Sequence, residues 1–454
     1  MSEINDSIPD SWANTPLSDF ASDEPNSFVD GPFGSDLKVS DYTDDGVRIL
    51  QLQNLGDGHF IDDNVKFTSN LKAASLFRCL VRPGDLLIAK MAEPLARACI
   101  VPQKIERGLI VADLIKLRLD RRHDATFIAS AINGAEFRRE AERLSTGTTR
   151  TRISLSTLKR IRLKAPPSSE QRRIGVLIRT LDKAIEQTEA LIAKHQQIKA
   201  GLMHDLFTRG VTPDGHLRPT RDLAPDLYKE SPLGWIPKEW EVVSTENCAT
   251  KVPGSTSIGP FGSDLLAADY RSEGIPVVFV RDVKEDSFEW NSEVYVTPEK
   301  AVRLSAHAVK AGDIISTKMG FPPCISCAYP DWMEPGVITA DIIRLRPDPS
   351  RIDTRWLSAA LNSDAFKREV QAITAGVTRP KVTLSDYRKL RLARPIKVEQ
   401  AMMADRLESV VNLISRESIK LQKLQKQKNG LMHDLLTGHV RVPEPADVMA
   451  CSIG

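Results

Sequence analysis

The heptapeptide GPFGSDL at residues 31–37 recurs letter for letter at residues 259–265, an offset of 228 positions. The same offset pairs RPGDLLIAK (82–90) with KAGDIISTK (310–318). Self-similarity at a fixed spacing is the mark of a repeated structural unit, and here one duplicated unit of about 200 residues covers nearly the whole chain. The fold must therefore be built twice from one plan.

Each copy of the unit has two parts. The first part contains short apolar runs separated by Gly-Asp and Pro-Gly dipeptides, which predicts short strands joined by turns. Within it, residues 127–144 and 356–373 have helical spacing instead. The second part of each copy is a long predicted helix, which ends in the repeated sequence GLMHDL at 201–206 and 430–435.

The two long helices carry a seam of residues at alternating spacings of three and four. In each helix five of the eight seam positions are apolar. Such heptad spacing over about four repeats predicts a coiled coil, and two copies in one chain favour an intramolecular antiparallel pair. The alternative is that each helix packs separately on its own globular domain. The seam positions are Ile178, Leu181, Ile185, Thr188, Ile192, His195, Lys199 and Leu202, and Leu407, Val410, Ile414, Glu417, Leu421, Leu424, Lys428 and Leu431.

We therefore expect an α+β protein in which two repeated globular α/β domains are separated by two long antiparallel coiled-coil helices with pseudo-two-fold symmetry. A Pro- and Gly-rich connection between the first helix and the second domain is long enough to permit that antiparallel arrangement. The predicted boundaries are residues 1–165 for the first domain, 166–208 for the first helix, 209–234 for the linker, 235–395 for the second domain, 396–437 for the second helix and 438–454 for a C-terminal tail.

The composition excludes several classes of protein. Hydrophobic residues make up 41% of the 454 positions, which is enough for sizeable cores. No apolar run is long enough to span a bilayer, and the N-terminal residues do not form a signal peptide. Six cysteines are too few for a disulfide framework. We expect a soluble cytoplasmic protein with no membrane association.

Charge is distributed unevenly along the chain. The formal net charge is only +2, but residues 1–63 carry fourteen acidic and two basic side chains. Residues 138–164 carry nine basic side chains against two acidic ones, and residues 367–394 carry eight against two. Because the two basic segments occupy matching places in the repeat, they indicate a shared role in binding an anionic partner.

No candidate catalytic motif is both complete and present in the two copies of the unit. No Gly-Lys dipeptide exists for a phosphate-binding loop. Asp10, Asp36 and Lys38 have the acid–acid–lysine order of metal-dependent nucleases. The second copy does not repeat it, because Lys238 and Leu266 stand at the places of Asp10 and Lys38. Cys324 and Cys327 form a lone pair without the four ligands that a structural zinc site needs. His433 repeats His204 near a helix end, where a cation suits the helix dipole or contacts a partner. The sequence predicts no catalytic residue, no metal site and no bound cofactor.

Both copies place a basic turn after the small predicted helices, at residues 146–152 and 375–381. Hydroxyl groups and glycine amides in such a turn can donate to phosphate, and arginine binds it bidentately. A lysine also ends each of the two matching predicted strands with the pattern GD-x-x-x-x-K, and its side chain faces either DNA or solvent. The candidate DNA-binding residues are Arg150, Arg152, Arg379 and Lys381 in the turns, and Lys90 and Lys318 at the strand ends.

Two similar but non-identical readers on a rigid spacer suit a split DNA target. Symmetric DNA readers contact half-sites roughly 34 Å apart, and a helix from Ile174 to Leu206 would span about 50 Å at 1.5 Å per residue. Since the two domains differ in sequence, the two half-sites should differ as well. Such a pair of readers predicts an asymmetric, bipartite double-stranded DNA site.

The sequence resembles the specificity subunits of Type I restriction–modification systems. The resemblance rests on the overall plan together with three sets of residues. These are Glu170-Gln171 and Glu399-Gln400 at the helix starts, the helix endings Gly201 to Val211 and Gly430 to Val440, and the entry Trp235 to Trp240 into the second copy. It extends over residues 8–440.

The resemblance implies that the two globular domains are target recognition domains and that the helices act as a ruler between them. It implies no catalysis in this chain. Two methyltransferase subunits carrying S-adenosylmethionine would dock on it, and restriction–translocase subunits would join for cleavage. The acidic stretch 1–30 departs from this pattern, and its charge suggests a surface tail or a subunit contact. The alternative function is a non-catalytic coiled-coil scaffold whose duplicated domains bind only protein.

Overall fold

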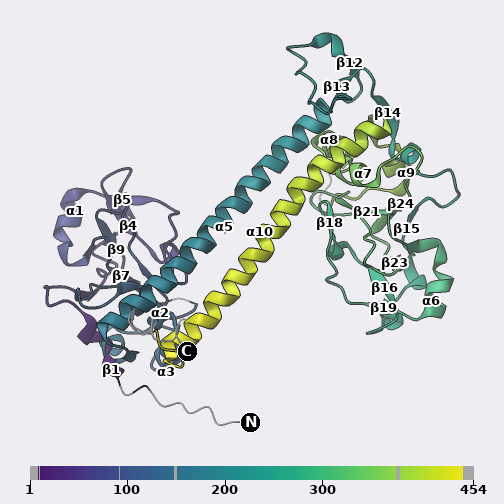
Figure 1. The fold of residues 1–454 in the computed structure, drawn as a ribbon. Helices are drawn as coiled ribbons and strands as arrows, with labels where there is room; N and C mark the ends of the chain where they lie inside the picture. Colours follow the sequence, from purple (N-terminus) through teal and green to yellow (C-terminus); the bar gives the residue numbers. More distant parts are fainter. Residues whose placement is uncertain (1–8, 10, 92, 148–150, 375–378, 443–454) are drawn as a thin grey trace, which may run out of the picture. The chain divides into compact units, whose positions relative to one another are not determined.

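The structure is a computed structural model that describes residues 9, 11–91, 93–147, 151–374 and 379–442 (Figure 1). The chain divides into two compact units. The first unit takes the residues up to Glu189 together with those from Ile419 on, and the second takes Ala190–Ser418. Each unit therefore contains one globular domain and a segment of both long helices.

The first unit contains two main sheets. A four-stranded sheet has the order β2-β10-β7-β8 with every neighbouring pair antiparallel. A second sheet has the order β3-β5-β4-β9-β6, in which β4 and β9 run parallel. A further antiparallel pair joins β1 to β11. The strands are β1 (Ala13–Pro16), β2 (Phe28–Asp30), β3 (Tyr42–Thr43), β4 (Val47–Leu50), β5 (Lys66–Thr68), β6 (Leu80–Val81), β7 (Leu86–Ala89), β8 (Ala98–Ile100), β9 (Gly108–Ile110), β10 (Leu114–Leu117) and β11 (Arg162–Ala165).

The second unit repeats this plan. The antiparallel sheet β15-β24-β21-β22 matches the first sheet, and β19-β16-β23-β20 matches the second, again with one parallel pair, β16 and β23. The pair β14 and β25 corresponds to β1 and β11. The strands are β12 (Tyr228–Ser231), β13 (Gly234–Pro237), β14 (Glu241–Ser244), β15 (Thr256–Ile258), β16 (Ile275–Val278), β17 (Val283–Lys284), β18 (Ser287–Phe288), β19 (Tyr295–Val296), β20 (Ala308–Val309), β21 (Ile314–Thr317), β22 (Ser326–Ala328), β23 (Gly336–Ile338), β24 (Ile342–Leu345) and β25 (Arg391–Arg394).

The short helices also repeat, down to their capping residues. Asp124 and Asp353 cap α2 and α7 by accepting hydrogen bonds from backbone amides of the first turn, and Ser154 and Thr383 cap α4 and α9 in the same way. In each unit the predicted helical stretch forms two helices, the first of which contacts the antiparallel sheet. The short helices are α1 (Asn70–Ser75), α2 (Ala125–Asn133), α3 (Ala135–Arg143), α4 (Leu155–Arg160), α6 (Pro298–Arg303), α7 (Thr354–Ala360), α8 (Asp364–Thr374) and α9 (Leu384–Lys389).

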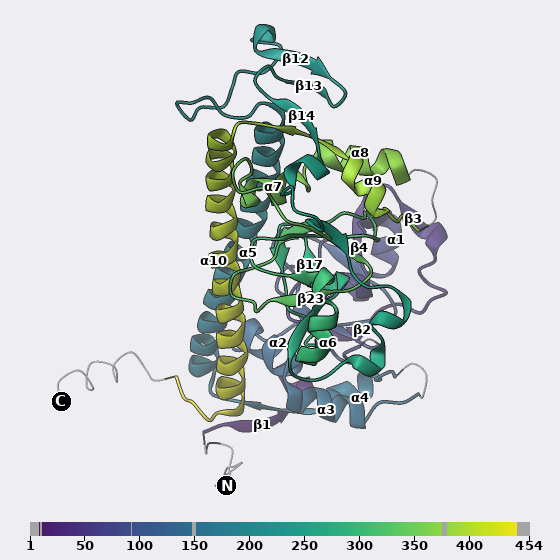
Figure 2. The same ribbon diagram turned by 90° about the vertical axis from the view of Figure 1, so that its right-hand side faces the viewer.

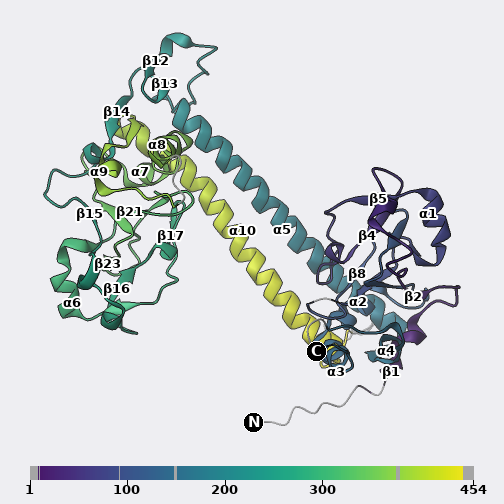
Figure 3. The ribbon, with the colours of Figure 1, turned by 180° about the vertical axis from the view of Figure 1, so that it is seen from behind.

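The long helices are α5 (Ser168–Thr208) and α10 (Lys397–Thr437). In each unit a segment of α5 lies beside an antiparallel segment of α10 (Figures 1 and 3). All sixteen predicted seam positions are buried or half-buried. The predicted α+β fold with paired antiparallel helices is thus confirmed, and the alternative of separately packed helices is wrong. Among the described residues, no helix combines the length and the apolar character that crossing a membrane requires.

The helix ends are part of the domain cores. In the first unit, Ile174 and Ile178 of α5 and Leu435 of α10 are buried in one cluster with Phe127 of α2. In the second unit, Leu206 of α5 joins Met403 and Leu407 of α10 around Trp356 of α7. Each domain is therefore anchored to both helices, because burial of one large apolar side chain contributes roughly 1.5–3 kcal/mol.

The predicted linker, residues 209–234, is structured rather than a plain connection. Val211, Arg218 and Tyr228 are buried, and the Tyr228 hydroxyl donates to the carbonyl of Pro219 at 2.6 Å. Strands β12 and β13 form an antiparallel hairpin that crosses the predicted boundary at 234/235 and projects past the end of α5 (Figure 2). The prolines and glycines that suggested a linker instead form turns around these buried side chains.

The anchoring of α5 can be tested with two substitutions on the same helix. Ile178 is 1% exposed within the first core, whereas Val176 is 53% exposed on the outer face. Ile178→Ala should lower the free energy of unfolding by about 2–5 kcal/mol, because it leaves a cavity, while Val176→Ala should change it by less than about 0.5 kcal/mol. Urea denaturation of both variants measures the difference. Equal losses would contradict the packing described here.

Candidate nucleic-acid interface

Three segments of the first unit meet beside the end of strand β7. Lys90 follows this strand, and its amide donates to the carbonyl of Asp113 while its own carbonyl accepts from the amide of Ile153, both at 2.9 Å. Gly31, the first residue of GPFGSDL, donates to the carbonyl of Leu114 at 2.9 Å. The heptapeptide and the strand-end lysine therefore bond to adjacent residues, Leu114 and Asp113, and the segment after the basic turn bonds to the lysine.

The second unit makes the same junction with its own copies. The amide of Lys318, after β21, donates to the carbonyl of Asp341 at 2.7 Å, and its carbonyl accepts from Val382 at 2.9 Å. Gly259 donates to the carbonyl of Ile342 at 3.3 Å. We call this arrangement the motif junction in both units. It explains why these three sequence motifs recur together, since the heptapeptide and the lysine bond to the same short segment and the segment after the basic turn bonds to the lysine.

The first glycine of the heptapeptide is required by lack of space. A Cβ atom at Gly31 would lie 1.9 Å from the carbonyl oxygen of Val111, and one at Gly259 would lie 2.2 Å from the carbonyl of Thr339. No side chain fits such a contact with a backbone, because neither partner can rotate away.

The two strand-end lysines are not solvated, so that alternative is wrong for both. The ammonium of Lys90 lies 3.1 Å from the carboxylate of Asp30, and the side chain is 15% exposed. Lys318 is buried, with its ammonium 4.7 Å from the centre of the Phe261 ring. Burial, and next the neighbouring charge of Lys381, lowers the pKa of Lys318. The lysines therefore brace the motif junction as well as adding charge to it.

The basic turns differ in how far their charges are already neutralised. Arg152 is half-exposed and lies 3.0 Å from the carboxylate of Asp113. Arg150 falls outside the described residues. Arg379 and Lys381 are exposed, and no ion pair involves either of them in the part of the chain that the structure describes. The second unit thus presents the more available positive charge beside its motif junction.

Apolar and aromatic side chains surround the second motif junction. A hollow of about 640 Å³ lies there, and the guanidinium of Arg281 stacks 4.5 Å from the centre of the Phe279 ring at its edge. The sequence pattern does not single out Arg281 and Phe279, because they lie in a segment that no repeated motif marks. The hollow is lined by Pro260, Gly262, Leu265, Tyr270, Phe279, Val280, Arg281, Met319, Thr339, Ala340 and Asp341.

The two junctions differ at the tip of one loop. Phe321 lies three residues after Lys318 and is 79% exposed, which is unusual for an aromatic side chain. The corresponding position of the first unit, three residues after Lys90, is the exposed carboxylate of Glu93. The same backbone plan therefore presents an apolar group in one unit and an anionic group in the other. The repeat offset of 228 could have revealed this pair in the sequence.

Two acidic residues of the N-terminal stretch, Glu24 and Asp30, are paired with cationic side chains of their own unit. Glu24 accepts hydrogen bonds from Arg82 at 2.8 Å and from Arg118 at 3.0 Å, and the bond from Arg82 lowers the pKa of Glu24. Asp30 pairs with Lys90 as described above. Over residues 11–30 the prediction of a surface tail is wrong, because this segment includes β1, β2 and buried side chains of the first core.

The repeated Glu-Gln pair at the start of each long helix has a structural role. In the second unit the buried carboxylate of Glu399 accepts from the guanidinium of Arg218, from the amide of Val211 at 3.0 Å and from the indole nitrogen of Trp240 at 3.1 Å. The start of α10 is thereby tied to the segment that follows the end of α5. A buried carboxylate with this many donors is fully compensated.

The first unit repeats this tie with the roles of the helices exchanged. Glu170 at the start of α5 binds Arg441, which follows the end of α10, at 2.6 and 2.7 Å. The adjacent glutamines connect the helices to the domains: the side-chain oxygen of Gln400 accepts from the amide of Asp353 at 2.9 Å, and Gln171 contacts the Asp124 amide at 3.3 Å. The sequence pattern singled out these Glu-Gln residues, but it did not identify their partners.

The tie at Glu399 makes a testable prediction about stability. Glu399→Gln removes a buried negative charge and leaves the buried guanidinium of Arg218 with only the exposed carboxylate of Glu239, 3.7 Å away, which should cost about 3–5 kcal/mol. Glu408→Gln removes a half-exposed partner of Arg355 and should cost less than about 1 kcal/mol. Thermal or urea denaturation of the two variants compares them. A loss at Glu399 no larger than the loss at Glu408 would contradict this role.

Comparisons with known proteins find a matching family model and similar relatives. Residues 110–196 match a family model described as the Type I restriction modification DNA specificity domain. The chain is 22% identical over 348 residues to the Type I restriction enzyme MjaVIII specificity subunit of Methanocaldococcus jannaschii, covering 74% of this chain and 75% of the relative. It is 21% identical over 412 residues to a putative type I restriction enzyme MjaX specificity subunit of the same organism, covering 87% and 88%.

Solved structures share the fold. The S subunit of a Type I restriction–modification system from M. genitalium matches with a TM-score of 0.57 and 13% identity, covering 96% of this chain and 98% of that one. A chain from a structure concerned with complex assembly and conformational transition of the type I system matches with a TM-score of 0.53 and 15% identity, covering 96% and 100%. The resemblance found in the sequence is confirmed.

Proposed function

We propose that this chain, a Type I specificity subunit in sequence and in fold, reads a split DNA site for a restriction–modification complex. The observation that carries this proposal is the motif junction, which each unit builds with the same backbone hydrogen bonds and then surrounds with different exposed side chains. A shared scaffold with divergent tips is what two readers of different half-sites require. No catalytic step is assigned to this chain.

Contacts to DNA divide into those that position the protein and those that read bases. Arg379 and Lys381 are exposed beside the second junction without an ion-pair partner among the described residues, which suits them to phosphate contacts. Arg152 suits the same role in the first unit, once Asp113 releases it. The tip residues Glu93 and Phe321 suit base edges, because a carboxylate accepts from the cytosine amino group and an apolar group contacts the thymine methyl.

The outer faces of the long helices support docking of other subunits. In the first unit α5 exposes Val176 and Leu177, and in the second unit α10 exposes Val411 and Leu413. Apolar side chains that stay exposed along a charged helix favour a protein partner. We infer that two methyltransferase subunits, each with S-adenosylmethionine, bind along these helices, that restriction–translocase subunits join them, and that the complex works in the cytoplasm.

Methylation mapping tests the function directly. The chain is co-expressed with its methyltransferase in a host without adenine methylation, and the host DNA is sequenced for modified bases. Reading of a split site predicts one bipartite asymmetric methylated motif that depends on this chain. Association with the methyltransferase without any such motif would favour the alternative, a scaffold that binds only protein.

Removal of a proposed phosphate contact should weaken binding on every sequence. Lys381→Ala should lower the affinity for specific and random duplexes alike and reduce the slope of log K against log salt by about 0.9, because one fewer counterion is released. Lys426→Ala, on the exposed face of α10, is the matched control and should change neither quantity. Fluorescence anisotropy across salt concentrations measures both. An unchanged slope, or an altered target sequence, would contradict the phosphate assignment for Lys381.

Change of a tip residue should instead alter one half-site only. Phe321→Ala should relax the half-site read by the second unit, with a loss of discrimination of about 1–3 kcal/mol at one base pair. Glu93→Ala should relax the half-site read by the first unit and leave the half-site read by the second unit intact. Methylation mapping of both variants shows which half of the motif becomes degenerate. If both variants retained the wild-type motif, the tip residues would not be base readers, although the function itself would stand.

A further inference from the structure

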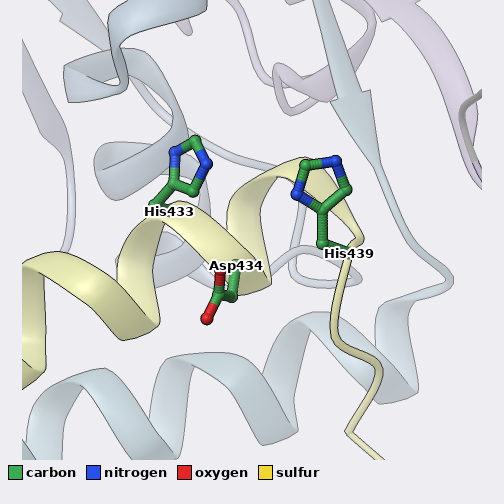
Figure 4. A group of neighbouring side chains, drawn as sticks. All are labelled: His433, Asp434 and His439. Carbon is green, nitrogen blue, oxygen red and sulfur yellow. The ribbon is translucent and has the colours of Figure 1, made fainter. Parts of the chain in front are cut away.

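Three potential metal ligands gather at the C-terminal end of α10 in the first unit (Figure 4). His433 and Asp434 belong to the last turns of the helix, and His439 follows it. One ligand atom of each side chain lies within 4.8 Å of the others, and the two imidazole rings are centred 5.8 Å apart. Both histidines are exposed, so small side-chain rotations can bring the three atoms closer.

The backbone explains how His439 comes to lie beside residues of the helix. Gly438 has a φ of 79°, a left-handed conformation that ends the helix and reverses the chain. The amide of Val440 then donates to the carbonyl of Asp434 at 3.2 Å, and the hydroxyl of Thr437 donates to the carbonyl of His433 at 2.7 Å. Because these bonds fix the turn, His439 is placed over the last helical turn, next to His433.

The other long helix provides an internal comparison. When the helix ends are aligned on their shared sequence GLMHDL, His204 and Asp205 of α5 match His433 and Asp434. On the same alignment Gly210 matches His439. There the carboxylate of Asp205 is paired with Arg209 at 3.0 Å. At the end of α10 this arginine is replaced by Gly438, and no cationic side chain pairs with Asp434 in the part of the chain that the structure describes. The first unit has thus lost an arginine and gained an imidazole.

The position favours a cation for a second reason. The last carbonyl groups of a helix carry partial negative charge, which stabilises positive charge placed beside them. Two imidazole nitrogens and one carboxylate oxygen form a ligand set that zinc takes in proteins, with water completing the four positions. Magnesium and calcium prefer oxygen ligands and suit this set less well.

We propose that His433, Asp434 and His439 bind one zinc ion, which ties the segment after α10 to the last turn of that helix. In the second unit Arg209 makes the equivalent tie to Asp205. The segment braced by the zinc ion carries Arg441, the partner of Glu170. The ion therefore strengthens the tie between the end of α10 and the start of α5 within the first unit. This inference goes beyond DNA reading and does not depend on it.

The test uses the full-length chain, purified without a histidine tag and freed of metal with a chelator. Isothermal titration with zinc chloride should show one bound equivalent for the wild type and none for His439→Ala. His204→Ala, which removes the matching histidine of α5, should still bind one equivalent. Zinc should also raise the melting temperature of the wild type and of His204→Ala, but not that of His439→Ala.

Circular dichroism without zinc verifies that the wild type and the two variants are folded. We expect this because the substituted histidines, His204 and His439, are both exposed. The proposal is overturned if the wild type binds no stoichiometric zinc, or if His204→Ala and His439→Ala lose binding to the same extent. DNA-site reading is measured separately by methylation mapping, so failure of the zinc site leaves that function untouched.

Discussion

A buried carboxylate at the start of each long helix is the interaction on which the other contacts depend. Glu399 and Glu170 are held by arginines that follow the end of the partner helix, Arg218 and Arg441 respectively. A carboxylate that stayed buried without its donors would be costly, so the two chain segments cannot separate unless the helix start also opens to water. The adjacent glutamines extend the same constraint from the helices to the first turn of the domain helices α7 and α2.

The duplicated plan separates what must be shared from what can differ. Backbone hydrogen bonds make the motif junction, and they need only the local chain path and a glycine at one position. Side chains around the junction carry no such constraint, and they differ: Lys90 is paired with Asp30, whereas Lys318 lies against an aromatic ring. The tips diverge further, from a carboxylate to a phenyl ring. One fold can therefore present two chemically distinct surfaces.

The sequence was sufficient to predict features that depend on periodicity. The repeat, the α+β plan and all sixteen seam positions follow from spacings along the chain, and the long helices begin and end within two residues of the predicted bounds. Contacts that depend on the path of a loop could not be predicted from the sequence. Burial of Lys318, the arginine partners of the two glutamates and the approach of His439 to His433 all require loops whose paths no local pattern specifies.

The division of the chain has a consequence for its synthesis on the ribosome. The second unit is continuous, Ala190–Ser418, so all of its residues are translated before Ile419 and the later residues of the first unit. The first unit begins at the N-terminal end but needs Leu435 for its core and Arg441 for its buried glutamate. Although domains generally fold in the order in which they are made, here the first domain to be translated is the last that can be completed.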